Sequence, residues 1–80
     1  MTIEEYDILN DAVADCLSEA IKSRKKWPPF HSPHEGYGVI LEELDELWDE
    51  IKKKNFDKEA ARKEATQTAA MLIRFIAELT

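Results

Sequence analysis

The chain is organised around the stretch Leu41-Glu42-Glu43-Leu44-Asp45-Glu46-Leu47-Trp48-Asp49-Glu50, which combines closely spaced carboxylates with an apolar stripe of helical period. The apolar positions that share this helical spacing are Tyr37, Ile40, Leu41, Leu44, Leu47, Trp48 and Ile51. At about 100° per residue, Glu43 borders the apolar arc and Glu46 lies on the same side of the helix. Acids placed only for solubility favour the opposite side, as Glu42, Asp45 and Asp49 do. The stretch is therefore either a solvated acidic flank or half of a metal site.

A second acidic position lies in the C-terminal part of the chain, in Glu64-Ala65-Thr66-Gln67. Glu64 also borders an apolar helical stripe, which consists of Ala65, Thr68, Ala69, Leu72, Phe75, Ile76 and Leu79. Burying an unpaired carboxylate is costly, and two like charges about 4 Å apart repel by roughly 4 kcal/mol at an effective dielectric constant near 20. If Glu43, Glu46 and Glu64 come together, they require a divalent cation or basic partners.

Capping and periodicity signals predict three helices, at residues 3–24, 33–54 and 58–79. The predicted caps are a capping box of Thr2 with Glu5, a second of Ser32 with Glu35, and Asp57 as the N-cap of the third helix. The turn Asn55-Phe56-Asp57 is short, so the second and third helices form an antiparallel hairpin. We expect an all-α fold in which residues 1–80 form a single domain, a three-helix antiparallel bundle completed by oligomerisation.

The hairpin also predicts where the acids lie. Counting from the turn, Glu46 and Glu64 fall at a similar height, on the order of 10–13 Å from it. Glu43 and Gln67 come one helical turn further out, again level with each other. Side chains spaced in this way on two facing helices converge, as they do in carboxylate-bridged metal bundles.

The spacing of these residues resembles the signature of a known family. Glu42-Glu43-x-x-Glu46 is followed, after seventeen residues, by Glu64-x-x-Gln67. This looks like the Glu-Glu-x-x-Glu and Glu-x-x-Asp pattern of the MazG-like all-α nucleoside triphosphate pyrophosphatases. The lead-in Pro33-His34-Glu35-Gly36-Tyr37 and the tail Ala69-Ala70-Met71-Leu72-Ile73-Arg74-Phe75 also resemble small stand-alone members, so the resemblance covers residues 27–79. Gln67 departs from the pattern, because the family has an Asp there.

The resemblance implies an enzyme: a Mg²⁺-dependent nucleotide pyrophosphohydrolase that cleaves a (d)NTP to the monophosphate and pyrophosphate, in the manner of a nucleotide-pool house-cleaning hydrolase. It implies metal ligation by Glu43, Glu46, Glu64 and Gln67, with Mn²⁺ as an alternative ion. Glu42, Glu43 or Glu46 would be the catalytic carboxylate that orients the attacking water. The resemblance also implies a homodimer or homotetramer.

Four further residues are candidates for substrate binding: Trp27, Phe30, Lys53 and Arg74. Trp27 and Phe30 flank two prolines, and their rings either cap the end of the bundle or form a wall of a nucleobase pocket. Lys53 belongs to a lysine run that either ends a helix in solvent or screens a triphosphate. Arg74 either contacts a phosphate or lies on a solvated face of its helix.

Composition restricts the partners and the compartment. The net charge of −6 argues against a nucleic-acid polymer or an anionic membrane as partner. A lone Cys16 fits a reducing compartment, and the sequence has neither an apolar run of membrane-spanning length nor a signal-peptide profile. We therefore expect a cytoplasmic protein.

Two non-catalytic hypotheses stand beside the enzyme. In the first, the chain is a MazG-like oligomerisation or nucleotide-sensing module whose metal site is degenerate because Gln67 replaces Asp. In the second, it is an interaction domain whose acids solvate an assembly edge, with Glu43 and Glu64 pointing apart or paired with basic residues. Pyrophosphate release from a nucleotide would separate the enzyme from both.

Overall fold

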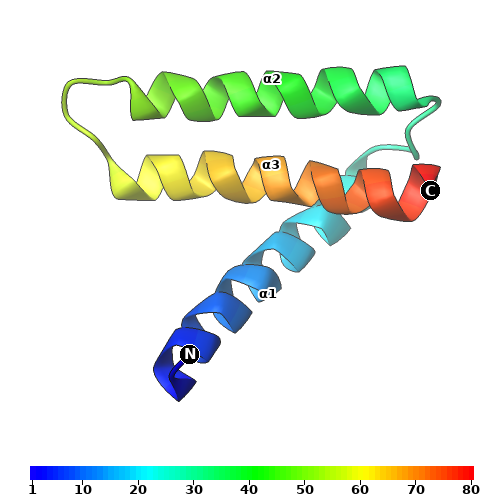
Figure 1. The fold of residues 1–80 in the computed structure, drawn as a ribbon. Helices are drawn as coiled ribbons and strands as arrows, with labels where there is room; N and C mark the ends of the chain where they lie inside the picture. The colour runs from blue at the N-terminus through cyan, green and yellow to red at the C-terminus, as the bar shows by residue number, and fades with distance from the viewer.

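The computed structural model describes residues 1–80 as an all-α protein, as predicted, with three helices and no strand. The helices are α1 (Ile3–Lys26), α2 (Pro33–Ile51) and α3 (Lys58–Leu79). α2 and α3 lie side by side and antiparallel, and α1 crosses α3 near the C-terminus (Figure 1). α3 is the central helix, because it packs against both of the others while α1 and α2 do not pack against each other.

The first two helices begin where capping predicts. Thr2 Oγ1 accepts a hydrogen bond from the Glu5 N–H and the Glu5 carboxylate accepts one from the Thr2 N–H, so a capping box starts α1. At the start of α2, Ser32 Oγ accepts from the Glu35 N–H. The second predicted capping box is only half formed, because the Glu35 carboxylate turns to the backbone N–H and the ring of His31.

The helix ends differ from the predicted ones by a few residues. α1 continues to Lys26, and Trp27 then takes an extended conformation because the following Pro28 disfavours the helical one. α2 ends at Ile51, before the predicted lysine-rich turn at its C-terminus. The start of α3 is as predicted, with the Asp57 carboxylate accepting hydrogen bonds from the N–H groups of the first turn.

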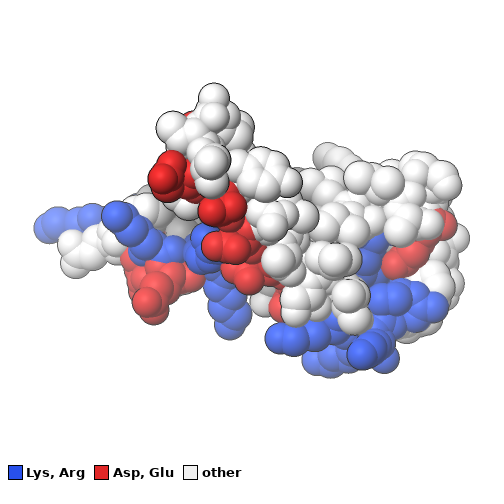
Figure 2. Space-filling model, turned by 90° about the horizontal axis from the view of Figure 1, so that it is seen from below, with Lys and Arg blue, Asp and Glu red and all other residues white.

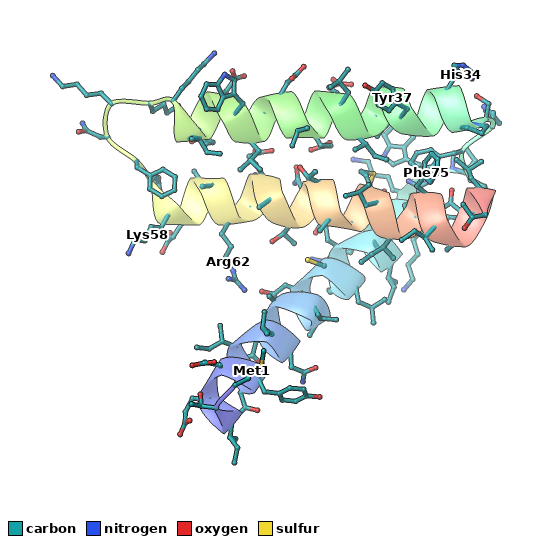
Figure 3. The ribbon with its side chains drawn as sticks, viewed as in Figure 1. Met1, His34, Tyr37, Lys58, Arg62 and Phe75 are labelled. Carbon is teal, nitrogen blue, oxygen red and sulfur yellow. The ribbon has the colours of Figure 1, made fainter.

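The core is small and lies where the C-terminal half of α1 meets α3. Its members are Ala20, Phe30, Ala70 and Met71, packed against Val39, Ile40, Ile73, Phe75 and Leu79. Small side chains at Ala20 and Ala70 allow α1 to approach α3 closely. The same core reaches α2 at Gly36, where an added Cβ would lie 2.8 Å from Phe75 Cδ2. Figure 3 shows Phe75 between α2 and α3.

A buried ion pair within α3, Arg74–Glu78, is the centre of a hydrogen-bond network that reaches α1 and the loop after it. Arg74 is only 4% exposed, and it donates hydrogen bonds to the Glu78 carboxylate at 2.7 and 3.1 Å, to Ser23 Oγ at 2.8 Å and to the Pro28 carbonyl at 2.9 Å. Its guanidinium also lies 4.4 Å from the centre of the Phe30 ring. The hydrogen bond from Arg74 is the main cause of the lowered pKa of Glu78. This network fixes the loop against the core.

Much of the apolar surface predicted for α2 faces solvent. The exposed side chains on this helix are Tyr37, Leu41, Leu44, Trp48 and Ile51, each 41–64% exposed. α3 packs instead against the neighbouring positions, among them Gly36, Ile40 and Leu47. None of the three helices has the length and apolar character that crossing a membrane requires.

Candidate metal centre

Three carboxylates meet in the middle of the α2–α3 hairpin. Glu43 and Glu46 are one turn apart on α2, and Glu64 approaches them from α3. Each contributes an oxygen, and these oxygens lie within 4.8 Å of one another. The hairpin therefore brings together the acids whose heights match along its two helices.

No basic side chain neutralises these acids directly. One oxygen of Glu43 and one of Glu64 are buried without a hydrogen-bond partner. None of the five salt bridges in the protein includes Glu43, Glu46 or Glu64. A buried carboxylate oxygen with no donor is costly, so this arrangement lacks a compensating positive charge. The interaction-domain hypothesis requires Glu43 and Glu64 to point apart or to pair with basic side chains, and the cluster does neither.

The pKa values of Glu43 and Glu64 are both raised, which also indicates that their charges are uncompensated. Burial is the largest cause of the raised pKa of Glu43, followed by the charges of Glu46 and Glu64. Burial also raises the pKa of Glu64, with the Glu46 carboxyl as the next cause and the charge of Lys63 acting in the opposite direction. A divalent cation would favour the ionised forms of all three acids. Their hard oxygen donors fit Mg²⁺ or Mn²⁺.

The fourth predicted ligand and the remaining catalytic candidate lie beside this cluster. Gln67 is partly buried one turn after Glu64 on α3, and Glu42 is exposed on α2. Both line a cavity that Glu43 also lines. The amide oxygen of Gln67 can coordinate a cation, but it adds no negative charge to the site.

This cavity has a volume of about 630 Å³ and is formed by all three helices together with the loop after α1. Phe30, Val39 and Met71 provide its apolar wall, and Lys22 and Lys26 of α1 provide positive charge. Its size is within the range of small-molecule pockets, which combine apolar walls with a few polar groups. The cavity therefore adjoins the acidic cluster at Glu43 and can accommodate a ligand with both an apolar and an anionic part.

Three of the four predicted substrate residues, Trp27, Phe30 and Arg74, line this cavity, and Lys53 does not. Trp27 is 58% exposed and lines the cavity, whereas Phe30 presents one side to the cavity and is otherwise buried in the core. Arg74 also lines the cavity, but its guanidinium is held by Glu78 and the loop. Lys53 lies at the end of α2, pairs with a carboxylate on its own helix and does not line the cavity.

Two cavity residues are absent from the predicted substrate residues, namely Lys22 and Lys26. Cations at the C-terminal end of a helix are expected from the helix dipole alone, so from the sequence Lys22 and Lys26 are either a solvated helix end or phosphate contacts. Their spacing of four residues does place both on one side of α1. Which side faces the cavity is decided by the crossing of α1 over α3, which the local sequence does not specify.

Comparisons with protein-family models, with curated proteins and with solved structures found no match for this chain. The features of this chain that bear on its function are therefore the unpaired acids of the cluster and the cavity next to them.

Proposed function

We propose that the protein is a divalent-metal-dependent nucleoside triphosphate pyrophosphohydrolase. The observation that carries this proposal is the convergence of Glu43, Glu46 and Glu64 with two buried oxygens that have no partner. The class of reaction is supported by the resemblance of the acidic spacing to that of the MazG-like pyrophosphatases. The cavity beside Glu43 supplies a place for a nucleotide.

The three glutamates would hold Mg²⁺ or Mn²⁺, with the amide oxygen of Gln67 as a neutral fourth donor. When bound, such an ion would supply positive charge that offsets the negative charge developing on the phosphates during cleavage. Mg²⁺ in nucleotide enzymes commonly uses only one or two carboxylates together with substrate phosphates. The missing fourth carboxylate is therefore compatible with metal binding.

The chain's own residues would position the substrate in the cavity. The exposed ring of Trp27 is suited to stack on a base, and Lys22 and Lys26 would attract the phosphates. Water would add across the bond between the α- and β-phosphates, leaving the monophosphate and pyrophosphate. Glu42 is exposed at the cavity wall and would orient this water, with Glu43 and Glu46 as the other carboxylates available for that role.

The proposed assembly is a homodimer or a homotetramer. The chain has an accessible surface of 6177 Å². A folded monomer of its mass, 9.3 kDa, is expected to have about 5,000 Å². The excess of roughly 1,200 Å² is larger than the roughly 800 Å² that a typical interface covers on each partner. A second copy would cover exposed apolar side chains such as Leu44 and Trp48.

The first test is an assay of purified protein with MgCl₂ and a panel of standard and damaged dNTPs, with released pyrophosphate as the readout. We expect metal-dependent release that falls at least about 100-fold in Glu64→Gln, because a metal ligand is lost. Asp45→Asn serves as the matched control, since it removes an exposed acid from the opposite side of α2. Activity that persists in Glu64→Gln would refute the proposed site.

Gln67 favours the non-catalytic module as the second candidate, because it removes a charge from the site. In that case, titration calorimetry would detect weak Mg²⁺ binding while no nucleotide releases pyrophosphate. Gln67→Asp distinguishes the two: it would strengthen Mg²⁺ binding in both cases, but it would increase an existing turnover only if the wild type is an enzyme.

A further inference from the structure

The segment Trp27-Pro28-Pro29-Phe30, which leads from α1 into the loop, is stiff and forms one wall of the cavity. All of its residues except Pro29 line the cavity. Each proline has a fixed φ angle and also favours an extended conformation in the residue before it. Trp27 is extended, as this requires. The position of Trp27 at the cavity therefore depends on how residues 28–30 are held.

One ion pair holds the backbone of this segment. Arg74 donates a hydrogen bond to the Pro28 carbonyl at 2.9 Å, and the Phe30 N–H donates one to the Glu78 carboxylate at 2.8 Å. These are the two hydrogen bonds that residues 28–30 make through their backbone. The Phe30 ring is buried in the core, but α1 and α2 do not pack against each other to support the segment between them. The Arg74–Glu78 pair therefore fixes the segment on both sides of Pro29.

Arg74 is poorly placed to bind a phosphate itself. It is 4% exposed, and all three nitrogen atoms of its guanidinium donate to acceptors within the protein. Lys22 and Lys26 are exposed at the cavity and are available to an anion. Figure 2 shows Lys and Arg gathered at the lower right, at the end of the molecule where the loop after α1 lies in Figure 1. The cavity therefore has basic residues for an anion without Arg74.

The pair is also separate from the metal centre. Arg74 follows Glu64 by ten residues on α3, which is about 15 Å along the helix. The hydrogen bonds of Arg74 and Glu78 go to each other, to Ser23 and to the loop, and none goes to the clustered acids. A change in the pair should therefore alter the cavity wall and leave the metal centre intact.

We infer that Arg74 and Glu78 are positioning residues for the nucleotide, because they hold the segment in which Trp27 forms the stacking wall for the base. This inference rests on the proposed function, since it assigns the pair a role in binding the nucleotide of that site. It assigns Arg74 to the cavity wall and not to a phosphate of the substrate.

Glu78→Gln distinguishes the positioning role from a phosphate contact. The variant keeps every atom of Arg74 and removes a negative charge, so a guanidinium that binds phosphate would hold a nucleotide as tightly as before or more tightly. One carboxylate oxygen becomes an NH₂ group, which cannot accept the hydrogen bonds that Arg74 and Phe30 donate. If the pair positions the wall, nucleotide affinity should fall at least about tenfold, since stacking on an aromatic ring contributes strongly to binding a base.

Titration calorimetry in MgCl₂ measures this affinity with the four α,β-imido-dNTPs, in which an NH group replaces the oxygen of the bond to be cleaved. Mg²⁺ alone should bind to Glu78→Gln as it does to the wild type, because the metal centre is unchanged. The matched control is Arg62→Gln with Asp15→Asn, which removes an ion pair between α3 and α1 that does not line this cavity. The control should leave nucleotide affinity unchanged.

A double-mutant cycle tests whether the pair acts through Trp27. Trp27→Ala should weaken binding of the same analogue, and adding Glu78→Gln should weaken it no further, because the stacking wall is already lost. Additive losses would mean that Glu78 affects binding by another route, and they would overturn the positioning role.

A second variant serves if Glu78→Gln fails to fold, since that change leaves the buried charge of Arg74 without its partner. Arg74→Met combined with Glu78→Leu removes both charges, a replacement that buried ion pairs often tolerate. Circular dichroism checks its helix content. It should weaken the α,β-imido-dNTP and the corresponding dNMP to the same extent, whereas loss of a phosphate contact would weaken the triphosphate analogue more.

The wild type separates the two possible failures. If it binds none of the analogues, the proposed function fails and the positioning role fails with it. If the wild type binds an analogue and Glu78→Gln binds it equally well or more tightly, the positioning role alone is overturned. Pyrophosphate release by the wild type would then still support the hydrolase.

Discussion

At the scale of single residues, Glu43 is the side chain whose energetics reveal most about the site. It is partly buried, it has an oxygen without a partner, and its raised pKa indicates that the folded protein disfavours its charge. The metal-free fold therefore stores repulsion that a cation would relieve.

We predict that Glu43→Gln stabilises the metal-free protein and abolishes its stabilisation by Mg²⁺. Solvent screening reduces the Coulomb repulsion, so the expected gain is about 1 kcal/mol, or roughly 4–8 °C in Tm for a domain of this size. Thermal unfolding in EDTA and in MgCl₂ measures both effects, with Asp45→Asn as the exposed control. A lower Tm for Glu43→Gln in EDTA would mean that Glu43 makes a favourable contact instead.

The same variant gives a prediction for pH. A carboxyl whose folded pKa is raised above its ordinary value of 4.5 contributes stability that is fully present below about pH 4.5 and is lost as the pH rises through the folded pKa. The advantage of Glu43→Gln over the wild type should therefore be greatest near pH 7 and shrink as the solution is acidified. Urea midpoints of both proteins in EDTA across this range would test the sign.

At the scale of elements, the close contact of α2 with α3 depends on a missing side chain. A Cβ at Gly36 would lie 2.8 Å from Phe75 Cδ2 and 3.0 Å from Leu79 Cδ1, whereas a Cβ at Gly38 would meet nothing within 4 Å. Both glycines lie in α2, so they have the same cost in helix propensity. They form a matched pair in which only packing differs.

We predict that Gly38→Ala stabilises the protein by about 1 kcal/mol through helix propensity. Gly36→Ala gains the same propensity but must displace the Phe75 ring, and overpacking typically costs about 1–3 kcal/mol. Gly36→Ala should therefore be the less stable of the two variants by at least about 1 kcal/mol. Urea unfolding compares them directly, and equal midpoints would show that α3 shifts without cost.

The positions of the helices in the sequence follow from local signals, but the rotation of each helix about its own axis does not. Thr2, Ser32 and Asp57 cap the three helices as predicted, because capping depends on a few adjacent residues. On α2, two neighbouring stripes of the same period compete for the contact with α3. The more apolar one, with Leu44 and Trp48, is left exposed, while the other contains Gly36, which lies close to the Phe75 ring.

The site was predictable to the extent that it depends on the hairpin. The short turn fixes the relative heights of Glu46 and Glu64, so their proximity follows from counting residues along two antiparallel helices. The cavity depends on how α1 crosses α3, and this crossing is set by tertiary packing rather than by the local sequence. For this reason the roles of Lys22 and Lys26 in its wall, and the difference between Trp27 and Phe30, emerge only from the coordinates.

At the scale of the whole molecule, the small core and the large accessible surface describe a chain that is incomplete by itself. Eight of its residues are buried, and the exposed apolar side chains lie mainly on the N-terminal part of α1 and on α2, where they are Tyr37, Leu41, Leu44, Trp48 and Ile51. A chain of this size is only marginally stable, so covering these surfaces would contribute a large part of its free energy of unfolding. Stability and assembly should then be coupled.

We predict that the Tm of the wild type rises with protein concentration, by roughly 3 °C for each tenfold increase, because only the folded chains associate. Trp48→Glu should remove this dependence by placing a charge on the exposed apolar face of α2. Phe56→Glu is the matched control: Trp48 and Phe56 are both 57% exposed, but Phe56 lies in the turn and outside that face. Calorimetric scans over two decades of concentration would measure the slopes. If the wild-type Tm is independent of concentration, or if both variants lose the slope equally, the exposed apolar face of α2 is not the surface through which folding and assembly are coupled.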